Sequence, residues 1–219
     1  MTTAVAIYLF TDAEVLDFAG PYEVFTTASR VFKRSNPHEP EPFHVFTVAR
    51  EAGNVRARAG LVVTPDYTFA TCPPIDLLLI PGGVVTAELA TPAVTAWISR
   101  AATEAQVTAS VCTGSFLLAQ AGLLEAKPAT THWEDIADLR AMFPRLAVLE
   151  ERRWVDTGPV VTSAGISAGI DMSLHLVDRL AGRELAVNTA RQIDFDWHED
   201  AYLTLHSSGL PAAATELKR

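Results

Sequence analysis

Short apolar runs recur along the chain, separated by segments in which apolar residues have helical spacing. The runs begin at Val5, Phe43, Ile75, Gln106 and Pro159, are often β-branched, and are followed by turn residues. Runs of this kind are typical of buried strands in a mostly parallel sheet. The sequence therefore predicts at least five core strands.

Two of the intervening segments, 93–105 and 167–182, have a clear helical pattern. The second places Ile170, Leu174 and Val177 on one face and ends at Gly182, a residue suited to a helix C-cap. Strands that alternate with helices predict an α/β sandwich, with helices on both faces of the sheet.

Two further segments predict antiparallel pairs. Residues 51–69 alternate around a turn and predict a small hairpin or strand pair, and residues 148–164 predict two strands around a turn at 156–158. No repeat or low-complexity linker is present. We therefore expect a single domain over residues 1–205 and a loosely held tail over 206–219.

Composition and charge narrow the possible functions. The 219 residues are 49% hydrophobic and 20% charged, as in ordinary globular proteins, and the net charge is −9. This balance disfavours nucleic acid and membrane surfaces as partners. The first residues lack the positive charge of a signal peptide, and no apolar run is long enough to span a bilayer. We therefore expect a cytoplasmic protein.

The two cysteines, Cys72 and Cys112, fit a reducing compartment better than a disulfide framework, and their spacing resembles no zinc motif. We expect neither a metal nor an organic cofactor. Cys72 precedes two prolines at the entrance to a strand, which indicates a structural residue.

Cys112 lies in the sequence SVCTGS, between a strand expected to end at Val111 and a helix expected to start at Thr113. A residue at such a turn projects above the sheet, and Gly114 relieves crowding there. A helix N-terminus also favours a thiolate. Cys112 is therefore a candidate nucleophile, and the alternative is an inert buried cysteine.

A second strand ends in Pro81-Gly82-Gly83. The amides of Gly82 and Gly83 could point into a cleft and stabilise a developing negative charge. The alternative is an ordinary tight turn.

Asp17 and Glu23 flank the Gly20-Pro21 pair. Pro21 suits the first turn of a helix, so we expect Asp17 in the preceding loop and Glu23 inside the helix. A carboxyl group beside a thiol could move a proton. Alternatively, Asp17 caps a turn and Glu23 is a solvated helix residue.

His132, in ATTHWED, is the histidine whose context suits activation of a thiol. A structural histidine satisfied by the backbone fits this position equally well. The residue directly after Cys112 is Thr113, not a histidine.

Taken in order, these motifs resemble the DJ-1/PfpI superfamily. The stretches that carry the resemblance are LDFAGPYEVF, FATCPPIDLLLIPGG, SVCTGSFLLAQAGLLEAKPATTHW and GISAGIDMSL, and they run from about Val5 to about Asp194. Within the superfamily they are most similar to the isocyanide hydratase branch. The resemblance implies a homodimer of flavodoxin-like three-layer sandwiches with a mostly parallel central sheet.

The resemblance also implies roles for individual positions. Cys112 matches the nucleophile, Asp17 the acid/base carboxyl group and Thr113 a donor of hydroxyl and amide hydrogen bonds. Ile166 matches a residue beside the pocket, and Gly82 and Gly83 match the loop that faces the thiol. Thr113 stands where the protease-like branch has a histidine, which disfavours a peptidase. The transcription-regulator branch adds a basic DNA-binding domain, which we do not expect here.

The implied activity is addition of water to an isocyanide through a covalent thioimidate on Cys112. Two alternatives use the same cysteine. One is a redox sensor in which Glu23 assists oxidation, and the other is an amidase or glyoxalase-like hydrolase. The last segment, with Trp197, His198 and Asp200, departs from the hydratase pattern and could reshape the pocket.

Overall fold

A computed structural model of the chain describes residues 1–199. The central sheet has seven strands in the order β10-β11-β7-β6-β1-β2-β5, and all neighbours are parallel except β10 and β11. Its strands are β1 (Thr3–Tyr8), β2 (Phe43–Ala49), β5 (Tyr67–Thr68), β6 (Leu77–Ile80), β7 (Val107–Val111), β10 (Trp154–Asp156) and β11 (Val160–Ser163). Each of the five apolar runs overlaps a strand of this sheet, so the expected strands are confirmed.

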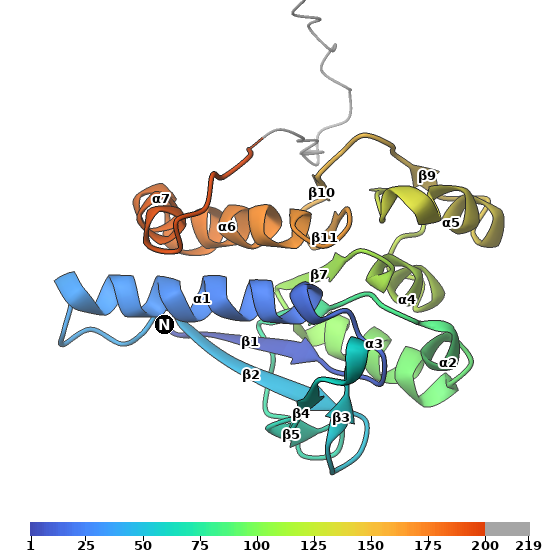
Figure 1. Ribbon diagram of the computed structural model, residues 1–219, viewed down its shortest axis with the longest axis horizontal. Helices are drawn as coiled ribbons and strands as arrows, with labels where there is room; N and C mark the ends of the chain where they lie inside the picture. The colour runs from blue at the N-terminus through green and yellow to red at the C-terminus, as the bar shows by residue number, and fades with distance from the viewer. Residues whose placement is uncertain (200–219) are drawn as a thin grey trace, which may run out of the picture.

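Helices cover both faces of the sheet (Figure 1). On one face α1, α6 and α7 pack against one another, and α2, α3 and α4 form a second group that reaches β6 and β7 through α4. The helices are α1 (Val15–Ser35), α2 (Thr86–Leu89), α3 (Pro92–Glu104), α4 (Gly114–Gln120), α5 (Ile136–Met142), α6 (Ala168–Ala181) and α7 (Arg183–Gln192). This is the predicted three-layer α/β sandwich.

Two small strand pairs lie outside the central sheet. β3 (Val55–Arg56) and β4 (Val62–Val63) form the predicted hairpin, whereas β5 joins the central sheet instead. The pair β8 (Pro128–Ala129) and β9 (Ala147–Val148) is parallel and brackets α5. Short 3₁₀ turns occupy 58–60 and 133–135.

The core strands are apolar on both faces because helices cover both. The side chains of Leu77–Ile80 in β6 are 0% exposed, and those of Val5, Ala6, Ile7 and Tyr8 in β1 are equally buried. A strand in this setting needs no polar alternation, which is why continuous apolar runs predicted these elements. No helix in residues 1–199 has the length and apolar character needed to cross a membrane.

The last described segment packs onto α6 and α7. The amide of His198 donates to the fully buried carboxylate of Asp171 at 2.8 Å, and the guanidinium of Arg183 lies 4.6 Å from the centre of the Trp197 ring. Asp200 and the tail expected at 206–219 lie outside the described residues, as does the expected domain boundary at 205.

Candidate active site

Cys112 occupies a sharp turn between β7 and α4 at the carboxyl edge of the sheet. Its φ of +55° is in the left-handed region, which a residue with a side chain rarely adopts. Neighbouring segments hold the turn in place: its amide faces the carbonyl groups of Ser163 and Ala164, and its own carbonyl accepts from the Thr131 hydroxyl at 2.9 Å. This geometry is a strand-to-helix elbow that raises the side chain above the sheet.

The Pro81–Gly83 loop lies directly against the elbow. A Cβ atom on Gly82 would come within 2.6 Å of the Thr113 amide nitrogen and 2.8 Å of Cys112 Cβ. Only glycine allows this approach, so the glycine at position 82 sets the distance between the loop and the thiol.

Both amides of the loop are engaged within the protein. Gly82 N–H donates to Asp17 Oδ2 at 3.0 Å, and Gly83 N–H donates to Thr113 Oγ1 at 2.9 Å. The Thr113 hydroxyl in turn donates to the carbonyl of Gly83, also at 2.9 Å. The sequence had suggested that these amides could stabilise an anion on a substrate. In this arrangement neither of them is free to do so. The loop instead orients Asp17 and Thr113.

Asp17 lies in the first turn of α1, so its expected place in the preceding loop was wrong. The helix begins at Val15, and Pro21 lies inside it rather than at its start. The missing N–H of Pro21 would have bonded to the carbonyl of Asp17, four residues earlier, so the helix continues with one bond lost. The shift is important because helical geometry carries the Asp17 side chain inward, where it is 0% exposed.

The Asp17 carboxyl group and the Cys112 thiol form an interacting buried pair. Burial raises the pKa of Asp17 from 3.8 to about 7, and hydrogen bonding from the Gly82 amide and the Cys112 thiol opposes the rise. Asp17 Oδ1 is buried and accepts no hydrogen bond of ordinary geometry in the described part of the chain. This oxygen therefore remains available to exchange a proton with the thiol or with a bound molecule.

The thiol is held in its protonated form. Burial and the Asp17 carboxylate raise the pKa of Cys112 from 9.0 to about 12, while the amide and hydroxyl of Thr113 favour the thiolate. The side chain of Thr113 thus serves both the thiol and the loop. Because Asp17 and Cys112 affect each other, they titrate as a pair, which holds two protons below about pH 7 and one proton above it.

Asp135, which the sequence analysis did not single out, also acts on the thiol. Its negative charge contributes to the raised pKa of Cys112, and its own pKa is raised by partial burial. It follows His132 by three residues, and its carboxylate lies 3.4 Å from His132 Nδ1. The sequence ATTHWED contained this pair, but only the fold places it near the elbow.

Two further candidate residues, Glu23 and Ile166, are partly or fully exposed. Glu23 is exposed on α1 and bonds to Thr27 at 2.8 Å and Arg30 at 2.7 Å. It is therefore oriented along its own helix. Ile166, at φ +50°, is 38% exposed in the turn before α6.

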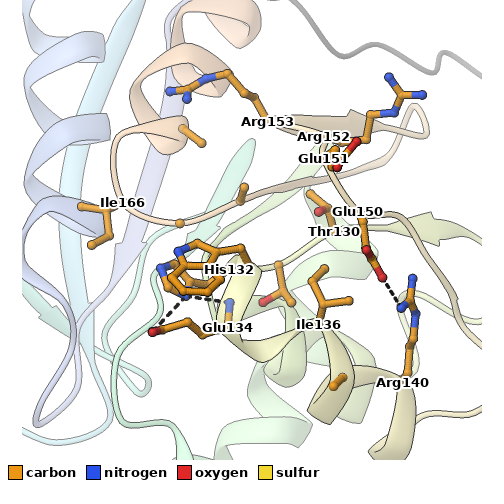
Figure 2. Close-up of a pocket in the computed structure, with 16 residues that line it drawn as sticks. Thr130, His132, Glu134, Ile136, Arg140, Glu150, Glu151, Arg152, Arg153 and Ile166 are labelled. Carbon is orange, nitrogen blue, oxygen red and sulfur yellow. Dashed lines mark hydrogen bonds and ion pairs between the residues drawn. The ribbon is translucent and has the colours of Figure 1, made fainter.

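Two cavities flank the elbow. We call the larger one, about 780 Å³, the Arg152 cavity (Figure 2). His132 and Ile166 line it, and Arg152 and Arg153 lie above His132 in the view of Figure 2. Arg153 is held by the buried Asp171 at 2.6 Å, so the carboxylate that binds the His198 amide also positions a residue of this cavity. The segment at Trp197 and His198 therefore reaches the cavity only indirectly.

We call the second cavity, about 550 Å³, the Asp138 cavity. Gly83 and Thr113 from the elbow region line it, together with Val84, Phe116, Asp135, Asp138 and Met142. Both volumes are in the range of small-molecule sites. Residues 1–199 contain no group of three or more His, Cys, Asp or Glu side chains able to hold a metal ion.

The fold and the elbow define an α/β protein with a candidate nucleophile at the edge of a parallel sheet. The DJ-1/PfpI family profile matches residues 3–179, so the chain belongs to the DJ-1/PfpI family. The resemblance seen in the sequence motifs is thereby confirmed.

Sequence relatives within the family have different functions. The chain is 32% identical over 197 residues to an isonitrile hydratase of Pseudomonas putida, which covers 89% of this chain and 79% of the relative. It is also 32% identical over 168 residues to the HTH-type transcriptional regulator CdhR of Pseudomonas aeruginosa, covering 77% of this chain but only 50% of the regulator. The chain thus spans half the length of that regulator.

Solved structures agree with the fold. A ThiJ/PfpI family protein from Pseudomonas syringae superposes with a TM-score of 0.78 at 28% identity, over 91% of this chain and 78% of that one. Drosophila melanogaster DJ-1beta gives a TM-score of 0.76 at 18% identity, over 90% of this chain and all of that one. At this identity, the second likeness concerns the fold alone.

Proposed function

We propose that the protein is a cysteine-dependent hydratase that converts an isocyanide into an N-substituted formamide. The observation that carries the proposal is the buried Asp17 carboxyl group, fixed by Gly82 and beside Cys112. Similarity to an isonitrile hydratase supports it.

The first half of the proposed reaction joins the thiol to the substrate. The Asp17 carboxylate takes the thiol proton while Cys112 sulfur attacks the terminal isocyanide carbon. Protonated Asp17 then returns that proton to the same carbon. One S–C bond and one C–H bond form, and the product is the thioimidate Cys–S–CH=N–R.

The second half consumes water. Ionised Asp17 accepts a proton from water as the water oxygen attacks the thioimidate carbon, and Asp17 passes this proton to the nitrogen. The C–S bond then breaks as Asp17 carries the proton of the new hydroxyl group to the departing sulfur, which restores the Cys112 thiol, and R–NH–CHO leaves. The sum is R–NC + H₂O → R–NH–CHO, and no external oxidant or reductant is needed.

The engaged loop amides favour this reaction over an amidase reaction on the same cysteine. Acyl transfer develops a negative oxygen that needs preorganised donors. Here the amides of Gly82 and Gly83 are bonded to Asp17 and Thr113. Attack on an isocyanide carbon requires a proton at that carbon instead, and the proposal assigns its delivery to Asp17.

The same electrostatics disfavour the redox-sensor alternative. Sensor cysteines are accessible and have a low pKa, whereas the pKa of Cys112 is raised and its residue is 8% exposed. Glu23, which would assist oxidation in that alternative, is bonded to Thr27 and Arg30.

The proposal includes a cytoplasmic homodimer that acts on a small molecule without nucleic acid, membrane or cofactor. Cys72 and Cys112 are free thiols in the described structure, which suits a reducing compartment. The dimer rests on the family resemblance, and light scattering of the purified chain tests it.

The direct test is formamide production from an aryl isocyanide. We expect native protein to form the product and Cys112→Ser to lose at least a hundredfold in rate. Cys72→Ser is the matched control, because Cys72 is the other free thiol, and it should keep full activity. Absence of product with native protein would refute the proposal. In that case the rate of Cys112 oxidation by peroxide would test the sensor.

A further inference from the structure

The Asp138 cavity and the Arg152 cavity are lined by residues that interact with different parts of Cys112. The Asp138 cavity is lined by Thr113 and Asp135, both of which act on the thiol. The Arg152 cavity is lined by Thr131 and Ala164, which bond to the main chain of Cys112. Thr113 and Asp135, which act on the Cys112 thiol, therefore line the Asp138 cavity and not the Arg152 cavity.

The lining of the Asp138 cavity is suited to an apolar group. Phe116 and Val85 form buried surface, and Val84 and Met142 are 49% and 53% exposed. Exposed apolar side chains around a concave surface commonly mark a site where an apolar group binds.

The two cavities also differ in charge. The lining of the Asp138 cavity includes the carboxyl groups of Asp135 and Asp138 and no Lys or Arg side chain. The lining of the Arg152 cavity combines three arginines with three glutamates, and Arg140 is paired with Glu150. Of the two cavities, the Asp138 cavity therefore presents only negative side chains to a charged group of the substrate, whereas the Arg152 cavity presents both signs.

We propose that the Asp138 cavity binds the N-substituent of the isocyanide, and that Asp135 and Asp138 select substrates whose substituent is apolar and either neutral or cationic. Carboxylate-bearing isocyanides are disfavoured. This inference rests on the proposed function and extends it to a substrate class. At separations of about 7 Å near a protein surface, each carboxylate is worth roughly a three- to tenfold preference between opposite charges.

Two alanines on α5 provide a matched pair for testing the location. Ala141 lines the Asp138 cavity and Ala137 lines the Arg152 cavity, and both are exposed positions on the same short helix. We expect Ala141→Trp to lower kcat/KM for benzyl isocyanide at least tenfold more than for methyl isocyanide. Ala137→Trp should change both by less than twofold. The opposite pattern, or equal effects of both variants, would overturn the proposal.

Charge selection is tested with Asp138→Asn. We expect the variant to reduce the preference for an aminoalkyl isocyanide over a carboxyalkyl isocyanide by roughly three- to tenfold, with little change for a neutral one. Glu151→Gln removes a negative charge from the Arg152 cavity and is the control. An unchanged preference in Asp138→Asn would contradict the proposed selection.

A second readout does not depend on hydration. In a Cys72→Ser background, Cys112 can be modified with a cationic trimethylammonium-ethyl or an anionic sulfonatoethyl methanethiosulfonate. We expect the cationic reagent to react faster, and the ratio of rates to fall several-fold in Asp135→Asn and in Asp138→Asn. If native protein hydrates no isocyanide but this ratio responds, the proposed function fails while the charge selection stands. If this ratio of rates is unchanged in both Asp135→Asn and Asp138→Asn, the proposed charge selection is wrong.

Discussion

The amide of Gly82 donates to the Asp17 carboxylate at 3.0 Å, joining residues 65 positions apart in the chain. The carbonyl of Gly82 also accepts from the Glu14 amide at 2.8 Å, so the start of α1 is bound to the loop after β6 on both sides. This double connection fixes the buried carboxyl group beside the Cys112 thiol.

Replacing Asp17 with asparagine tests its role in proton transfer. Asp17→Asn retains an oxygen for the Gly82 amide but cannot carry the thiol proton, so we expect kcat to fall by about 10²–10⁴. Formamide assays measure the loss. Glu23→Gln, on the exposed side of α1, should stay within twofold of native activity. Full turnover by Asp17→Asn would exclude the assigned role.

The pH profile should rise across neutrality. Below the pKa of Asp17, about 7, both the thiol and the carboxyl group hold protons, and no base is available to ionise the thiol. Above it the pair holds one proton and can react. We therefore expect kcat/KM for a neutral alkyl isocyanide to increase from pH 5.5 to about 8 and then level off. A profile that falls with pH over this range would mean that the resting enzyme needs a protonated Asp17.

Replacing Asp17 with asparagine should raise the stability of the protein while it lowers activity. The folded pKa of Asp17, about 7, lies above the ordinary value of 3.8, so ionisation destabilises the folded protein as pH rises between these values. Asp17→Asn removes this cost, which is up to about 4 kcal/mol when fully developed. Urea unfolding at pH 8 should show the stabilised variant, and the difference should shrink at pH 5. An equal difference at both pH values would point to packing rather than charge.

Adding one methyl group at Gly82 should damage the site. Its Cβ would lie 2.6 Å from a backbone nitrogen of the elbow, which cannot move without displacing Cys112. We expect Gly82→Ala to lose about 1–3 kcal/mol of stability and most activity, measured by unfolding and formamide assays. Gly122→Ala is a control, because no atom lies within 4 Å of its Cβ position and only its φ of +77° is unfavourable. It should lose stability but keep its activity per folded molecule.

The sequence predicted the layers and the elbow because these depend on local patterns. Apolar runs covered on both faces identify strands whatever their partners, and SVCTGS contains its own turn. The start of α1 was misplaced because Pro21 is usual at a helix start, yet packing against the Gly82 loop begins the helix six residues earlier, at Val15.

The electrostatic role of Asp135 could not be predicted from the sequence. It depends on the segment before α5 lying beside the elbow, where the Thr131 hydroxyl donates to the Cys112 carbonyl, a contact that no spacing along the chain records. Glu23 differs, because its partners Thr27 and Arg30 lie four and seven residues farther along the same helix, so the solvated helix residue given as the alternative could be read from the spacing. Sequence patterns assigned residues to helices and strands, but contacts between distant segments, such as that of Asp135 with the elbow, depend on the fold.

The elbow also links chemical reactivity to the folded state. Asp17, Gly82 and Cys112 follow β1, β6 and β7, three strands that must all pair before the thiol is enclosed. Until then the cysteine is an ordinary exposed thiol with its pKa near the usual value of 9.0. Unfolded copies in a cell should therefore react with general electrophiles faster than native copies do. On the proposed function, correct folding protects Cys112 from indiscriminate chemistry and reserves it for molecules that enter beside Asp17.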